Sequence, residues 1–168
     1  MKDRFKYGKC IFTNPNLDNI NEMLEMMNDP EIQSMLTTHP RTYTYEDEVS
    51  WIKSNQDKDC FSTYDANTLD YIGNGGYNEI DNDRGEIGIV IRKQMQGKHY
   101  AKDIINGLID YGFNILNLNE IYAIVFSDNI KSLTCMKELG FTEYDRDKNV
   151  IERNGNKVDD IYLSLKRK

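Results

Sequence analysis

The sequence has little proline and lacks a long hydrophobic run. Three prolines in 168 residues are too few for a proline-rich linker or a low-complexity chain. The longest nearly uninterrupted apolar stretch outside a helical pattern, 87–91, is far shorter than the ~20 residues that span a membrane. The first twenty residues hold no apolar core typical of a secretory signal. We therefore expect a cytoplasmic protein without a membrane partner.

Metal-binding and nucleic-acid-binding signals are also lacking. Three cysteines without a C-x-x-C pair and only two histidines, His39 and His99, predict reduced thiols and no catalytic metal. The 21 basic residues are outnumbered by 28 acidic ones, which gives a net charge of −7. This balance argues against general nucleic-acid affinity and mildly favours cationic partners.

The hydrophobic periodicity predicts one α+β domain over residues 1–168. Apolar spacing indicates helices at 20–27, from Thr44, at 101–116 and at 130–139, the first of them stopped by Pro30. Strands are expected at 7–12, 61–64, 71–79, 86–91, 120–126, 141–150 and 159–165. The strand, helix, strand order over 86–126 needs a right-handed crossover between parallel strands. We thus expect a mostly antiparallel central sheet with one parallel pair and about four helices on its faces.

The segment 94–101 has the features of an anion site. Gly97 and Lys98 stand between a strand and the strongest predicted helix, whose first N–H groups have no partner within the helix. A glycine there lets a phosphate approach the backbone closely. The alternative is a plain tight turn with a solvated lysine. Neither a Walker A loop nor a G-x-G-x-x-G fingerprint is present.

Residues 86–141 carry several linked motifs in order. These are Glu86-Ile87-Gly88-Ile89-Val90-Ile91, Gln94-x-x-Gly97-Lys98-x-Tyr100-Ala101, Asp110-Tyr111-Gly112-Phe113, and Asn129-x-x-Ser132 followed by Lys137-Glu138-Leu139-Gly140-Phe141. The block resembles the acyl-CoA-binding half of the GNAT N-acyltransferases, closest to the ribosomal-protein and spermidine N-acetyltransferase branch. Residues 1–80 match only in element order and form the expected acceptor-side half, and 142–168 supply the C-terminal strands.

The resemblance implies acetyl-CoA as co-substrate and no metal. It implies that the strand carrying Ile89, Val90 and Ile91 splays from its parallel neighbour and hydrogen-bonds the pantetheine arm. The backbone N–H groups implied for the pyrophosphate are those of Gln96, Gly97, Lys98, His99, Tyr100 and Ala101. Asn129 and Ser132 are implied on the other side of the cofactor. The family has a glycine or alanine where this chain has His99, whose side chain either points outward, as we expect, or contacts a phosphate.

The resemblance also bears on the catalytic groups. Glu86 stands where some members of the family have a general base, the alternative being an ordinary strand-end carboxylate. The family's frequent proton-donating tyrosine corresponds to Met136, which has no proton to donate. His39 either lines the amine site or, as we favour, is a surface histidine.

We therefore expect an N-acetyltransferase that joins acetyl-CoA and a primary amine in a ternary complex. The acceptor is a polyamine, an aminoglycoside or a protein N-terminus, because the chain is acidic and carries Glu46, Asp47 and Glu48 on its acceptor side. A helix N-terminus that attracts acidic residues explains the same run, and we favour this explanation. The alternative function is a non-catalytic acyl-CoA-binding or regulatory module. Exposed strand edges make a homodimer possible.

Overall fold

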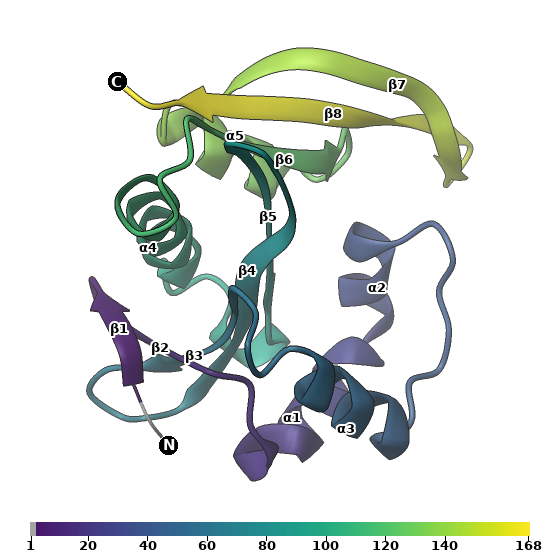
Figure 1. Ribbon diagram of the computed structural model, residues 1–168. Coiled ribbons are helices and arrows are strands. Elements are labelled where there is room, and N and C mark those ends of the chain that lie inside the picture. Colours follow the sequence, from purple (N-terminus) through teal and green to yellow (C-terminus); the bar gives the residue numbers. More distant parts are fainter. Residues whose placement is uncertain (1–2) are drawn as a thin grey trace.

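A computed structural model describes residues 3–168. Its strands form one eight-stranded sheet with the order β1-β2-β3-β4-β5-β6-β8-β7 (Figure 1). The strands are β1 (Asp3–Tyr7), β2 (Cys10–Thr13), β3 (Cys60–Asp65), β4 (Tyr71–Asp81), β5 (Arg84–Ile91), β6 (Glu120–Phe126), β7 (Thr142–Arg153) and β8 (Asn156–Lys166). The helices are α1 (Ile20–Met27), α2 (Pro30–Leu36), α3 (Tyr45–Ser54), α4 (Tyr100–Asn114) and α5 (Ile130–Glu138), with short 3-10 turns η1 (Leu17–Asn19) and η2 (Lys93–Met95). The predicted mixed α+β class is confirmed.

Two of the strand predictions need correction at turns. The single strand expected at 7–12 is a hairpin, because Gly8 adopts a left-handed φ of 53° and reverses the chain between β1 and β2. The last two strands are longer than expected and meet at Asn154–Gly155, where φ is 53° and 77°. Positive φ at both residues is typical of a type I′ turn, for which Asn-Gly is the preferred sequence.

The segment after α1 also differs from expectation. Helix α1 ends at Met27, before Pro30, as predicted, but Pro30 itself occupies the first turn of a further helix, α2, where its missing N–H costs nothing. The Asp29 side chain caps this helix by accepting hydrogen bonds from the backbone N–H groups of Glu31 and Ile32, at 2.9 and 3.1 Å. Before α3, the capping box between Thr44 and Asp47 is confirmed.

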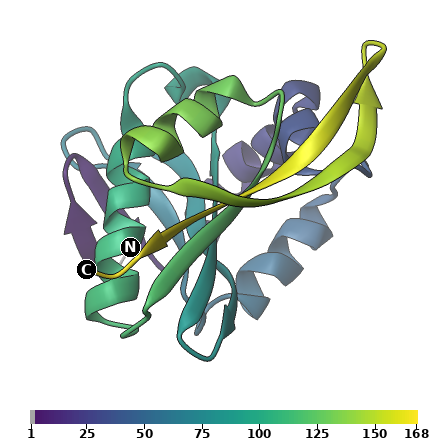
Figure 2. The same cartoon turned by 90° about the horizontal axis from the view of Figure 1, so that it is seen from above.

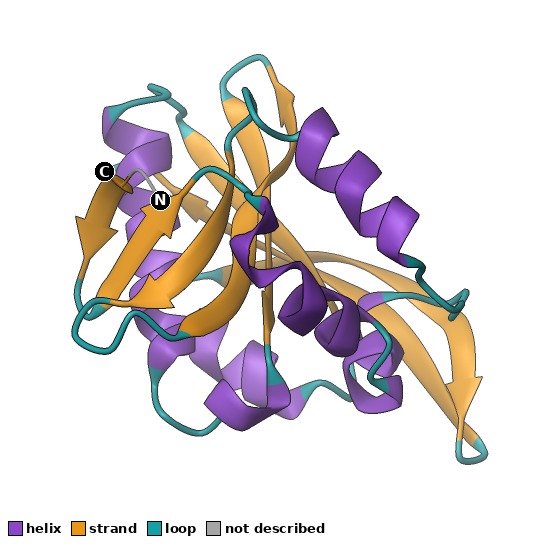
Figure 3. Ribbon diagram, turned by 90° about the horizontal axis from the view of Figure 1, so that it is seen from below, coloured by secondary structure: helices purple, strands orange, loops and turns teal. Residues whose placement is uncertain are grey.

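The helices cover both faces of the sheet (Figures 1 and 3). On one face α4 and α5 pack on β5, β6 and β8 through a core that includes Ile104, Leu108 and Ile121. On the other face α1 and α3 enclose a second core around Met23 and Tyr71. The two cores hold the centre of the sheet between helical layers.

The one parallel pair of the sheet opens along its length. Strands β5 and β6 are in register at Arg84–Glu120, Gly85–Ile121 and Glu86–Tyr122, and the pairing ends there. Strand β5 continues beside β4 as far as Ile91 while β6 turns away with β8, as Figures 1 and 2 show. This is the predicted splay, and its vertex is the Glu86–Tyr122 pair.

Candidate active site

The splayed part of β5 holds Ile89, Val90 and Ile91. Their neighbours on β4 are Gly75, Asn74 and Gly73, so one edge of this segment is paired. Among the described residues no strand pairs with its other edge beyond Glu86. The side chains of Ile89 and Ile91 pack toward the α4 core, and that of Val90 packs toward the opposite one. An extended ligand arm can therefore add to this edge as a strand does.

The loop from η2 to α4 turns sharply at two left-handed residues. Gly97 has a φ of 75°, and a side chain placed there would meet nothing within 4 Å, so the space beside its backbone is open. His99 has a φ of 67° and is the N-cap of α4, yet its side chain makes no capping hydrogen bond. The first N–H groups of α4 thus have no side-chain cap, as an anion-binding helix end requires.

His99 adopts a backbone conformation that favours glycine. This accounts physically for the small residue that the resemblance implies at this position. The His99 side chain is exposed.

The residues predicted to bind phosphate differ in whether their backbone N–H groups already have a hydrogen-bond partner and in where they lie. The Gln96 N–H donates to the Lys93 carbonyl at 3.3 Å, and the Gln96 side chain donates to the Ile91 carbonyl at 3.0 Å, so this residue is part of the turn. Lys98 is exposed beside the open Gly97, and its carbonyl accepts a hydrogen bond from the Lys9 ammonium. Ala101 lies in the first turn of α4.

Tyr100 fastens the start of α4 to the sheet. Its side chain is buried, and its hydroxyl donates to Asp65 Oδ2 at 2.6 Å. That bond, together with the backbone N–H groups of Thr68 and Asn67, lowers the pKa of Asp65 to about 2. The same bond raises the pKa of Tyr100 to about 12. The buried Tyr100–Asp65 hydrogen bond therefore anchors the loop to the sheet, and the solvent-facing side of the loop is accessible to a ligand.

Glu86 lies at the vertex of the splay. Asn78 Nδ2 donates to its Oε1 at 3.2 Å, and the Tyr122 hydroxyl donates to its Oε2 at 3.5 Å. The side chain is half-buried, so the carboxylate is oriented by neighbours yet accessible. These are the conditions that a positioned base needs.

The other predicted residues are distributed around this centre. Asn129 caps α5 by accepting the Ser132 N–H at 3.3 Å, and both residues are half-buried at the end of β6. Met136 is only 3% exposed and belongs to the core. His39 is exposed and hydrogen-bonds Thr38 through Nδ1 at 2.9 Å.

The acidic run at 46–48 starts α3 but does not present three free carboxylates. Asp47 completes the capping box and pairs with Arg41 at 2.9 Å. Glu48 is only 4% exposed, and burial followed by the charge of Asp47 raises its pKa. These contacts agree with the favoured explanation of the run, a helix N-terminus that attracts acidic residues.

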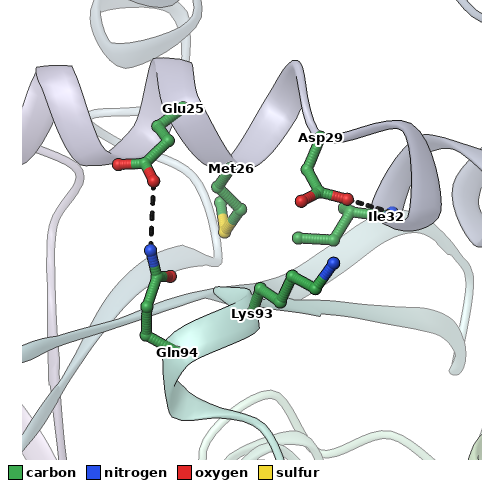
Figure 4. Close-up of a pocket in the computed structure, with 6 residues that line it drawn as sticks. All are labelled: Glu25, Met26, Asp29, Ile32, Lys93 and Gln94. Atoms are coloured by element: carbon green, nitrogen blue, oxygen red, sulfur yellow. Dashed lines mark hydrogen bonds between the residues drawn. The ribbon is translucent and has the colours of Figure 1, made fainter.

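A pocket that sequence reasoning missed lies between the helices and the loop (Figure 4). Its volume is about 210 Å³, and its lining is Glu25, Met26, Asp29, Ile32, Lys93 and Gln94. Gln94 Nε2 donates to Glu25 Oε1 at 3.0 Å across the pocket (Figure 4). The signal in the sequence was the N-cap pattern Asp29-Pro30, which predicts α2 and with it the position of Asp29.

The comparisons with known proteins agree with this geometry. Residues 9–142 match the Acetyltransferase (GNAT) domain family. An uncharacterized N-acetyltransferase, p20, of Bacillus licheniformis is 30% identical over 156 residues, which are 89% of this chain and 88% of that protein. The chain belongs to the GNAT acetyltransferase family. It is thus an acyl-CoA-dependent acetyltransferase by family.

Two further matches involve spermidine N-acetyltransferases. The enzyme of Vibrio cholerae is 43% identical over 58 residues, 34% of each chain. Its crystal structure in complex with CoA and spermine superimposes with a TM-score of 0.83 at 24% identity, covering 94% of this chain and 95% of that one. At that identity the superposition shows the GNAT fold.

In residues 3–168 no helix has the length and apolar character to cross a membrane. The same residues contain no group of three or more His, Cys, Asp or Glu side chains arranged to hold a metal ion.

Proposed function

We propose that this GNAT protein transfers the acetyl group of acetyl-CoA to a primary amine, with a polyamine as the first candidate acceptor. The observation that carries the proposal is the open edge of β5 leading to an uncapped helix start beside Gly97. An unpaired strand edge suits the amide-containing pantetheine arm, and the helix N-terminus suits a pyrophosphate. The thioester supplies the activated acetyl group.

The chain's own residues would then serve three tasks. Ile89, Val90 and Ile91 bind the arm through their backbone, and N–H groups from Gly97 to Ala101 bind phosphate oxygens. Asn129 and Ser132 approach the cofactor from the start of α5. Glu86, at the vertex, takes a proton from the amine as it attacks the acetyl carbon.

A cationic acceptor fits the charge of the molecule. The net charge is −7, and the pocket beside α1 and α2 contains two carboxylates, Glu25 and Asp29, against one ammonium, Lys93. Negative potential raises the local concentration of a polycation and speeds its association. The partial match to spermidine N-acetyltransferases supports a polyamine before an aminoglycoside or a protein N-terminus.

The first experiment is calorimetric titration with acetyl-CoA and with CoA. Gly97→Trp should lower the affinity for both at least about 100-fold, because a bulky side chain fills the space that phosphate needs and strains a left-handed residue. Gly155→Trp is the matched control, since Gly155 has a φ of 77° and equally open surroundings in the β7–β8 turn. Equal binding by wild type and both variants would refute the phosphate loop.

A non-catalytic acyl-CoA-binding module is the second candidate. It is favoured by one observation, the buried Met136 at the position of the family's usual proton donor. Turnover of acetyl-CoA with spermidine, spermine, an aminoglycoside and a short peptide separates the two functions. Release of CoA with any of these amines supports the enzyme, and saturable binding without turnover of any of them supports the module.

A further inference from the structure

The departing sulfur of a thioester needs a proton. Met136 has none to donate, so the proton comes from another side chain or from water in this chain. The vertex of the splay offers one hydroxyl. Tyr122 stands directly opposite Glu86 in the last parallel pair of β5 and β6. Its hydroxyl oxygen lies 3.5 Å from Glu86 Oε2, a long hydrogen bond of the kind that tightens when substrates bind.

We propose that Tyr122 donates the proton to the departing sulfur and that Glu86 returns one to Tyr122. This inference rests on the proposed function. The amine nitrogen forms a bond to the acetyl carbon and gives a proton to Glu86, while the carbon–sulfur bond breaks and its electron pair stays on sulfur. The Tyr122 phenol protonates that sulfur, and the Glu86 carboxylic acid reprotonates the phenolate. An amide and a thiol result, and both side chains regain their starting states.

The geometry of Glu86 allows it to connect the two proton transfers. Asn78 holds Oε1 at 3.2 Å, which leaves Oε2 facing the Tyr122 hydroxyl. A carboxylic acid is a far stronger acid than a thiol, so the net movement of the proton from Glu86 through Tyr122 to sulfur is downhill. The relay explains how a phenol, itself a weak acid, serves as the donor.

The charged surroundings of Tyr122 keep its phenol protonated. Burial, followed by the carboxylates of Glu86 on β5 and Glu79 on β4, raises its pKa. Tyr144 on β7 acts in the same direction. Arg84 opposes them, with its guanidinium carbon 4.1 Å from the centroid of the Tyr122 ring. The balance favours the neutral phenol, the form that has a proton to give.

Tyr162 provides a matched control for the kinetic test. It lies on β8 opposite Ile124, and its hydroxyl donates to a carboxylate, Asp147 Oδ2, at 2.8 Å. Tyr122→Phe should lower kcat about 100-fold, within the range for loss of a general acid, and leave KM for acetyl-CoA within about twofold. Tyr162→Phe should keep kcat within about twofold. A Tyr122→Phe variant with kcat within about threefold of wild type would overturn the proposal.

A second readout does not depend on turnover. With carbon-13 at the Cζ of a tyrosine incorporated only at position 122, NMR titration of the free protein follows the Tyr122 phenol. Glu86→Gln should shift the titration of Tyr122 to lower pH, because it removes a negative charge beside the phenol. An unshifted titration would show that the two side chains are not coupled and would contradict the relay. This outcome stands even where the Phe variant folds poorly.

The results that would refute the Tyr122 relay can be distinguished from those that would refute the proposed acetyltransferase function. A wild-type protein that turns over no amine refutes the enzyme, whatever Tyr122 does. An active wild type with an equally active Tyr122→Phe variant refutes only the proton donor. Circular dichroism and acetyl-CoA binding by each variant verify that the fold and the cofactor site are intact.

Discussion

Residues 86–141 supply the proposed cofactor site mainly from backbone, whereas residues 3–80 supply side chains to the proposed amine site. In the first region the ligand-facing groups are an unpaired strand edge and a helix start opened by Gly97. In the second they are carboxylates such as Glu25 and Asp29, held by α1 and α2. Backbone groups cannot be exchanged by substitution, and side chains can. The comparison suggests that the first region fixes the acyl donor and the second selects the amine.

The largest expected effect tests Glu86, the proposed base, which lies at the start of the 86–141 region. Glu86→Gln should lower kcat about 100-fold at neutral pH, because the amide cannot accept a proton from the amine. Binding of acetyl-CoA should be unchanged, since the backbone of β5 is unaltered. Glu152→Gln, at an exposed carboxylate of β7 opposite Lys157, is the control and should stay near wild-type activity. Full activity of Glu86→Gln from about pH 6 to 9 would exclude Glu86 as the base.

The same contrast explains what could be predicted from the sequence. The open loop follows from local signals, a glycine before a strongly amphipathic helix, whereas the splay was predicted from the resemblance to the GNAT family, and the structure contains both. The pocket beside α1 depends on how helices pack onto the loop, which no local pattern encodes. Proline is common both after a helix and in the first turn of a helix, so Pro30 alone does not predict α2. Without α2, the position of Asp29 beside the pocket could not be predicted. The pairing of Glu86 with Tyr122 required the register of two strands separated by a whole helix.

An intermediate effect tests the acceptor side. The double variant Glu25→Gln with Asp29→Asn should raise KM for spermidine about tenfold, because two carboxylates near the cation are neutralised. KM for acetyl-CoA should not change. Asparagine is a good N-cap, so α2 should persist. Glu22→Gln, one turn earlier on α1, controls for general charge. If the double variant keeps its spermidine KM, the pocket is not part of the amine site.

The smallest expected effect concerns His99 in the proposed phosphate loop. A substitution there separates the contribution of its backbone conformation from that of its imidazole. His99→Gly should raise the unfolding free energy by up to about 1 kcal/mol, because a left-handed φ of 67° costs histidine more than glycine. The extra conformational freedom of glycine in the unfolded chain offsets part of this gain. Thermal unfolding measures this change. Acetyl-CoA affinity should stay within about twofold, because the proposed phosphate contacts come from backbone N–H groups and we expect the exposed imidazole to make none.

A clear loss of affinity in His99→Gly would show instead that the imidazole contacts a phosphate. Repeating the titration with dephospho-CoA, which lacks the ribose 3′-phosphate, would then distinguish that phosphate from the pyrophosphate. Either result bears on the contrast between the two regions, because a ligand-binding imidazole would add a side chain to a phosphate loop that is otherwise proposed to act through its backbone.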